Sequence, residues 1–212
     1  MLPEGGASPP DAFRRLLEAA APGFGLCLSE PVLAGLARYL AELDIRRRTT
    51  NLTGPLPVEE LAAHALESVL GERLIAQGTR LVDIGSGAGF PGLPLAIARP
   101  DLSVTLLEPR AKRVAFLRHA VRALPVENAR VEAGAARDLP RGAFQTATSR
   151  AVGRLPDALG EADFLPANGA LLVWTADAER LGNSLASVFR FERMIPVPAT
   201  RSRAIALYRK SS

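Results

Sequence analysis

Hydrophobic residues in the first third of the chain recur every three or four positions, the spacing of one face of an α-helix. One such segment covers residues 11–21, and Asp11 is suited to cap its first turn. A second begins at residues 29–31 and carries leucine or alanine at positions 33, 36, 37, 40 and 43. A third covers residues 59–77. The pattern therefore predicts a helical N-terminal part.

After position 79 the pattern changes to short apolar runs that alternate with helical stretches. The runs read LVDI, VTLLE, ARVEA, FQTATS and GALLVW, and the helical stretches between them include PLAIA, KRVAFLRHAVRAL, residues 155–162 and residues 178–186. Strands that alternate with helices predict an α/β fold with a mostly parallel, doubly wound sheet. Two final β-like segments, 191–197 and 203–208, have no helix between them, which predicts an antiparallel edge hairpin.

These patterns divide the chain into two expected parts. Residues 1–57 form an N-terminal helical appendage, and residues 58–212 form the α/β domain. The length of 212 residues suits one domain with a small addition. No apolar run approaches the roughly 18 residues that span a bilayer. The N-terminus lacks the pattern of a secretory signal, and with one cysteine, Cys27, a reducing, cytoplasmic location is expected.

The stretch LVDIGSGAGFPG, residues 81–92, carries the first candidate chemistry. Gly85, Gly87 and Gly89 follow a predicted strand, where a loop lies at the carboxyl edge of the sheet and the ligand binds. Glycines let the backbone approach a ligand and adopt positive φ. The loop lacks a Gly-Lys-Ser/Thr ending, so a P-loop is disfavoured. The glycines alone leave NAD, a nucleoside phosphate and S-adenosylmethionine open.

Two acidic residues narrow this choice. Glu108 ends the second predicted strand, where an acid binds ribose hydroxyls. Asp83 lies two positions before Gly85, where its charge would repel a pyrophosphate and favour a ligand with an ammonium and a sulfonium group. The alternative for Asp83 is a carboxylate that caps amides of the loop. The two acids together favour S-adenosylmethionine.

The composition bears on which kind of partner the protein could bind. The net charge is +4 and nearly all of the basic residues are arginine. This balance is compatible with a phosphate-rich partner or with a solvated basic surface, and charge alone favours neither.

The spacing Asp-x-Gly-x-Gly-x-Gly with a later strand-end acid resembles class I methyltransferases. The longer stretch GSGAGFPGLPLAIARPDLSVTLLEPRAKRVAFLRHA resembles the family of small-subunit ribosomal RNA guanine-N7 methyltransferases. Matching pieces in the same order are Asn51-Leu52-Thr53, His64 with Glu67-Ser68, residues 149–152 and the final AIALYRK. The chain differs from the family pattern at residues 46–47, 135–137, Glu67 and 175–176.

The resemblance implies an enzyme that transfers a methyl group from S-adenosylmethionine to N7 of a guanine in 16S ribosomal RNA, naked or in the small subunit. It implies that Glu108 binds the ribose, that Ala135 and Ala136 border the adenine, and that Arg150 faces the reacting pocket as the catalytic candidate. The other implied cofactor residues are Asp83, Gly85, Ser86, Gly87, Gly89 and Phe90. Candidates for RNA contact are Arg46, Arg47, Arg48, Asn51, His64, Arg110, Lys112 and Arg113. A metal is not expected, and a monomer is.

The residues suit this chemistry. Guanine N7 has a free lone pair and loses no proton before it attacks a methyl group, so alignment matters more than a dedicated base. A cytosine-C5 enzyme would need a cysteine nucleophile near a strand end. Cys27, the single cysteine, is expected instead to be a buried small hydrophobe in the N-terminal part. A salt bridge of Arg150 to Asp83 or Glu108 is the structural alternative for that residue. A different methyltransferase, a non-catalytic RNA-binding factor and a dehydrogenase remain as rival functions.

Overall fold

The computed structural model describes residues 7–150, 155–198, 200 and 202–211. Within these residues, a seven-stranded sheet has the strand order β3-β2-β1-β4-β5-β7-β6. The strands are β1 (Arg80–Ile84), β2 (Ser103–Glu108), β3 (Ala129–Ala133), β4 (Thr146–Arg150), β5 (Ala170–Thr175), β6 (Phe189–Pro196) and β7 (Ala204–Lys210). The helices are α1 (Pro10–Ala20), α2 (Glu30–Arg47), α3 (Val58–Leu70), α4 (Gly92–Ala98), α5 (Ala111–Ala123), α6 (Leu155–Leu159) and α7 (Ala178–Leu185).

The sheet confirms the predicted α/β class. Strands β1 to β5 are mutually parallel, whereas β7 is antiparallel to β5 and β6 is antiparallel to β7. This gives the sheet an antiparallel edge at its C-terminal end, as the missing helix between the last two segments predicted. The parallel order reverses between β1 and β4, and the carboxyl ends of these neighbouring strands form the edge where ligands bind in such sheets.

The central part of the sheet is buried on both faces, which explains the apolar runs in β1, β2 and β5. Leu81 belongs to one hydrophobic core and the adjacent Val82 to the other. In β5, Leu172 and Trp174 face the first core, whereas Leu171 faces the second. This alternation follows from the two-residue period of a strand.

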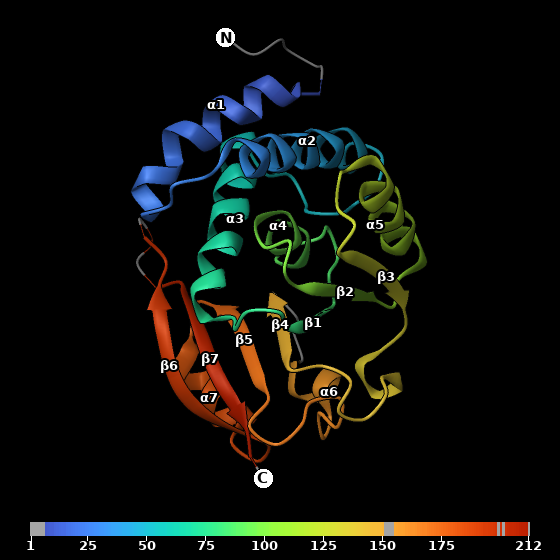
Figure 1. Cartoon of the computed structure of the whole chain (residues 1–212), viewed down its shortest axis with the longest axis vertical. Coiled ribbons are helices and arrows are strands. Elements are labelled where there is room, and N and C mark those ends of the chain that lie inside the picture. The colour runs from blue at the N-terminus through green and yellow to red at the C-terminus, as the bar shows by residue number, and fades with distance from the viewer. Residues whose placement is uncertain (1–6, 151–154, 199, 201, 212) are drawn as a thin grey trace.

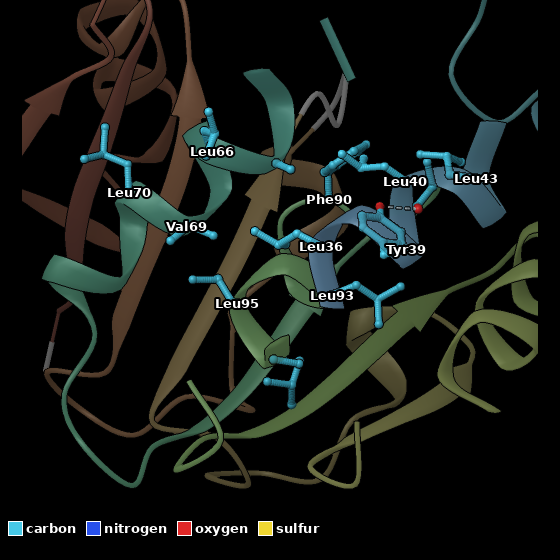
Figure 2. Packing of buried hydrophobic residues seen from close by; sticks show 14 of the residues in the cluster. Leu36, Tyr39, Leu40, Leu43, Leu66, Val69, Leu70, Phe90, Leu93 and Leu95 are labelled. Carbon is cyan, nitrogen blue, oxygen red and sulfur yellow. Dashed lines mark hydrogen bonds between the residues drawn. The ribbon is translucent and has the colours of Figure 1, made fainter. Parts of the chain in front are cut away.

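The N-terminal helices cover the first face of the sheet together with α4 and α5 (Figure 1). Leu36, Tyr39 and Leu40 of α2 share a core with Leu66 of α3 and with Leu93 of α4 (Figure 2). The helical appendage and the sheet are therefore held by one continuous core. The predicted boundary after residue 57 coincides with the start of α3, and the division into two parts stays a prediction.

Three expectations need correction. The helix predicted over residues 59–77 ends at Leu70 and continues as a short 3-10 turn, Gly71–Leu74. The helix predicted over residues 155–162 ends at Leu159, because Gly160 adopts a left-handed conformation with φ of 55°. Cys27 is exposed rather than buried. Among the described residues, none of the helices combines the length and the apolar character that a membrane span requires.

Candidate functional site

The glycine loop joins β1 to α4 and has a conformation that other residues rarely adopt. Gly85, Gly87 and Gly89 have φ values of 70°, 57° and 105°, which lie in the region that glycine favours. The N–H groups of Gly85 and Ser86 donate to the carbonyl of Leu107 in β2, at 2.9 and 3.0 Å. The loop is thus fixed to the neighbouring strand.

Helix α2 supports the same loop from the N-terminal part of the chain. The Tyr39 hydroxyl donates to the carbonyl of Ala88 at 2.8 Å, and this bond is the dashed line in Figure 2. A Cβ atom on Gly89 would lie 3.0 Å from the Tyr39 oxygen and 2.7 Å from Leu93 Cδ1. The third glycine is therefore required by close packing as well as by its φ value.

Asp83 lies beneath the loop and is completely buried. Its carboxylate accepts from the Thr148 hydroxyl at 2.9 Å and from the Gly92 N–H at 3.2 Å. Burial raises the pKa of Asp83 to about 7, against the opposing effect of these hydrogen bonds. These contacts match the capping alternative, and Asp83 does not line the cavity described below. Its direct contact with a ligand stays a prediction.

Glu108 ends β2 and holds the loop from the side. One carboxylate oxygen accepts from the Gly87 N–H at 2.9 Å, and the other accepts from the Arg110 N–H at 3.0 Å. The Arg113 guanidinium lies 4.0 Å away. Each carboxylate oxygen has a second lone pair, so Glu108 can still accept from a ligand hydroxyl.

A cavity of about 500 Å³ opens above this loop. Its volume falls within the range of small-molecule sites. The lining comes from the glycine loop, the end of β2, the start of α5, the segment between α2 and α3, and Arg150 of β4. The lining residues are Asn51, Leu52, Thr53, Gly54, Leu56, His64, Gly85, Ser86, Gly87, Ala88, Phe90, Glu108, Pro109, Arg110, Arg113 and Arg150.

Arg150 lies at the carboxyl end of β4 and pairs with a residue that the sequence did not indicate. Its Nη2 atom is 2.9 Å from Glu67 Oε2, so the partner is neither Asp83 nor Glu108. Its Nη1 atom donates to the His64 carbonyl at 3.4 Å, and its guanidinium carbon lies 5.9 Å from the centre of the Phe90 ring. Burial lowers the pKa of Arg150 from its ordinary value, and the Glu67 carboxylate opposes this shift. Arg150 therefore lies where its predicted role needs it, and the role itself stays a prediction.

The His64 side chain also lines the cavity, but as a neutral group. Its ring meets the Phe90 ring edge-on, with centres 5.8 Å apart. Burial, reinforced by the charges of Arg150 and Arg203, lowers the pKa of His64 to about 3. An uncharged ring cannot attract a phosphate as a cation would, so an RNA contact by His64 would have to be a hydrogen bond.

The three arginines at the end of α2 differ in their surroundings. The buried carboxylate of Asp44 lies 2.7 Å from Arg47 and 3.2 Å from Arg48, whereas Arg46 is exposed. Asp44 also accepts from the Ser8 N–H at 2.9 Å. Arg47 and Arg48 therefore help to hold the helix end, and their RNA contacts stay predictions.

The remaining predicted residues lie around the cavity or away from it. Asn51, Arg110 and Arg113 line it, whereas the exposed Lys112 does not. Ala135 and Ala136 follow β3 outside the lining; the Ala135 N–H donates to Asp138, and Ala136 packs in the second core. The motif residues 151–152 lie outside the described residues. The sequence did not indicate the role of Tyr39 or of Thr148.

The sheet order, the reversed final strand and the glycine loop define a class I methyltransferase fold. Solved structures agree: a SAM-dependent methyltransferase from Aquifex aeolicus has a TM-score of 0.57 and 18% identity, covering 69% of this chain and 89% of that one. A tRNA methyltransferase from B. subtilis has a TM-score of 0.58 and 14% identity, covering 69% and 65%.

The chain belongs to the family of rRNA small subunit methyltransferase G, which matches residues 33–178. Curated proteins of this name include one from Halorhodospira halophila, 36% identical over 82% of this chain and 83% of its own length. Those from Sorangium cellulosum and Thermobifida fusca are 45% and 41% identical over 70% and 77% of this chain. The chain spans 64% and 65% of the length of these last two proteins, less than two thirds.

Proposed function

We propose that this protein transfers a methyl group from S-adenosylmethionine to N7 of a guanine in 16S ribosomal RNA. The observation that carries the proposal is the position of Glu108, whose carboxylate fixes the Gly87 amide at the rim of the 500 Å³ cavity. Membership of the family of rRNA small subunit methyltransferase G supports the substrate class.

The cavity fits the proposed cofactor. Glu108 would accept from the ribose hydroxyls, and the glycine loop would contact the amino-acid part through backbone amides. Asp83 would support the loop from below through Gly92 and Thr148. When bound, S-adenosylmethionine supplies an electrophilic methyl group on a sulfonium.

The side chains around the cavity suit a reaction that needs alignment rather than a base. The N7 lone pair of guanine attacks directly, so no proton must leave before the new bond forms. His64, which lines the cavity, is neutral because its pKa is lowered to about 3. Arg150 would position the base, which is a contribution of orientation, and the Phe90 ring would exclude water from the first cavity.

Several basic side chains line the cavity or are exposed elsewhere on the surface, and these would contact the RNA backbone. Arg110 and Arg113 line the cavity, and Arg46 and Lys112 are exposed. Arginine and lysine side chains that meet phosphates fix the register of a nucleic acid without reading its sequence. We infer that the protein works as a monomer in the cytoplasm, where a ribosomal RNA substrate lies.

Methyl transfer tests the proposal directly. The protein is incubated with labelled S-adenosylmethionine and with bare 16S ribosomal RNA or small subunits from a strain that lacks the family enzyme. We expect one labelled guanine, methylated at N7, when the RNA is mapped. Tight cofactor binding without transfer would support a non-catalytic RNA-binding factor, and a preference for NAD in calorimetry would contradict the cofactor assignment.

Variants of the two central residues separate binding from transfer. Glu108→Ala is expected to weaken cofactor binding by about tenfold or more, equivalent to about 1.4 kcal/mol, because a buried acceptor is lost. Glu127→Ala is the matched control, since Glu127 is exposed and does not line the cavity. Arg150→Ala is expected to reduce chiefly the rate of methyl transfer, and an unchanged rate would remove Arg150 from the site.

A further inference from the structure

A second cavity, which we call the Trp174 cavity, lies beside the first and has a volume of about 370 Å³. It lies at the carboxyl ends of β4 and β5, next to the amino end of the antiparallel β7, where Thr175 pairs with Ala204. Arg150 lines both cavities, so they meet at this side chain. The lining residues are Glu67, Arg150, Leu155, Val173, Trp174, Thr175, Ala176, Leu181, Val197, Arg203 and Ala204.

The charged groups that line the Trp174 cavity form one ion-pair cluster. The Glu67 carboxylate lies between two guanidinium groups, 2.9 Å from Arg150 and 2.8 Å from Arg203. Its side chain is 2% exposed, whereas that of Arg203 is 42% exposed. The cluster therefore carries a net positive charge, with one cation at the junction with the first cavity and the other near solvent.

Most of the remaining lining is apolar, with Thr175 as the exception, and its aromatic part is well fixed. The Trp174 indole N–H donates to the Glu67 carbonyl at 2.8 Å, and the ring packs against Gly71 so closely that a Cβ there would overlap its edge. Leu155, Val173 and Val197 complete these walls. A flat aromatic ligand with polar edges fits such a lining.

We propose, resting on the function proposed above, that the Trp174 cavity receives the guanine base that is methylated. An enzyme that acts on a base removes it from its stack and places it in a pocket beside the reactive group. The Trp174 cavity adjoins the cavity assigned to the cofactor, and its size suits one base. The chemistry of guanine then assigns the role of Arg150.

Arg150 donates to guanine O6 at the junction of the cavities. Guanine presents two acceptors side by side, O6 and N7, but N7 must keep its lone pair free for the attack. Arg150 uses two of its N–H groups on Glu67 and on the His64 carbonyl, and other guanidinium N–H groups remain for O6. Adenine carries an amino group at the equivalent position, which a guanidinium cannot bind. The cavity should therefore prefer guanine to adenine.

Trp174 is the single tryptophan of the chain, so its fluorescence reports on this cavity. The protein, saturated with S-adenosylhomocysteine, is titrated with guanosine 5′-monophosphate and separately with adenosine 5′-monophosphate. We expect a saturable change in Trp174 emission, with guanosine monophosphate bound about tenfold more tightly than adenosine monophosphate, since a correctly matched base edge discriminates against the wrong base. Absence of a saturable change, or equal affinity for both nucleotides, would overturn the proposal.

A filled cavity gives an independent test. Ala176 lines the cavity yet is exposed, so Ala176→Phe should fold normally and occupy the space of the base. Ala186→Phe is the matched control, since Ala186 is exposed at the end of α7 and does not line the cavity. Phenylalanine also leaves Trp174 as the single tryptophan. We expect Ala176→Phe to weaken nucleotide binding by about tenfold or more and Ala186→Phe to leave it unchanged.

The two proposals can fail separately. Methyl transfer with a wild-type rate in Ala176→Phe would overturn the base pocket and leave the proposed function intact. Absence of transfer by the wild-type protein would overturn the proposed function, while the nucleotide titration would still decide whether the Trp174 cavity binds guanine. Calorimetry with S-adenosylhomocysteine shows whether Ala176→Phe leaves the first cavity unchanged, as the proposal requires.

Discussion

Two acidic residues at adjacent strand ends have different roles because their surroundings differ. Asp83 is completely buried, and the hydrogen bonds to its carboxylate come from Thr148 and Gly92. Glu108 holds amides at the rim of the cavity and contributes to its lining. When no cation lies close to a buried carboxylate, the loss of hydration disfavours its charged form and therefore favours the protonated form. Asp83 is therefore a support of the loop whose stabilising effect depends on pH.

Asp83→Asn is expected to change how stability varies with pH. In the unfolded chain the aspartate has a pKa of 3.8, whereas burial raises the pKa in the folded protein to about 7. Between these values the folded state holds more protons, so the contribution of Asp83 to the free energy of unfolding falls as the pH rises from about 4 to 7. The limit is about 4 kcal/mol, since each pKa unit is worth about 1.4 kcal/mol.

Asparagine retains an acceptor for the Gly92 N–H, and the Thr148 hydroxyl can rotate to accept from the amide. The variant should therefore lack this dependence, so that its stability relative to the wild type increases from pH 4 to pH 7. Urea denaturation at several pH values measures the difference. A constant difference between the two proteins would show that Asp83 is already ionised at low pH.

At the scale of elements, helix α3 contributes lining residues to both cavities. It carries His64 to the first cavity and Glu67 to the second. Its end lies against β5, where Gly71 allows the Trp174 ring to approach the backbone. The contact between α3 and β5 thus sets the position of both Glu67 and Trp174.

Gly71→Ala tests this contact. The added methyl group would overlap Trp174 Cζ2 and would lie 2.7 Å from Cη2. We expect a loss of about 1–3 kcal/mol in the free energy of unfolding, because such overpacking forces side chains or backbone to shift. Gly23→Ala is the control, since a Cβ there has nothing within 4 Å. Equal stabilities of the two variants would show that the ring can move aside at no cost.

The sequence predicted the elements better than the contacts between them. Alternation of short β-like runs with helical stretches was enough to identify all five parallel strands, of which β1, β2 and β5 are almost entirely buried. The pairing of Glu67 with Arg150 could not be predicted, since the residues are 83 positions apart and no local pattern joins them. The complete burial of Asp83 could not be predicted either, since it depends on packing between distant parts of the chain.

At the scale of the whole molecule, the first cavity is shared between the N-terminal part and the sheet. Residues 51–54 and Leu56, which connect α2 with α3, line the cavity opposite Glu108. Tyr39 of α2 fixes the loop through the Ala88 carbonyl. The N-terminal helices are thus part of the site as well as of the core.

The arginine residues that line this shared cavity allow a prediction of how RNA binding depends on salt concentration. Each phosphate contact releases counterions, so the logarithm of the association constant for bare 16S ribosomal RNA should fall linearly with the logarithm of salt concentration. Arg110 lines the cavity and is exposed. The variant Arg110→Ala should therefore reduce the magnitude of this slope by about one. Arg190 of the edge strand β6 lies at the other end of the sheet, and Arg190→Ala should leave the line unchanged.

The variant Arg47→Ala tests whether the Arg47 side chain binds an RNA phosphate or stabilises the folded protein. The Arg47 guanidinium lies 2.7 Å from the buried Asp44 carboxylate, so its removal leaves a partly unpaired buried charge. We expect the variant to lose about 3 kcal/mol of stability or more, as when one partner of a buried pair is removed, with little change in the steepness of the salt dependence. Thermal unfolding and filter binding measure the two effects on the same preparation. A reduced steepness with unchanged stability would place Arg47 on the RNA instead.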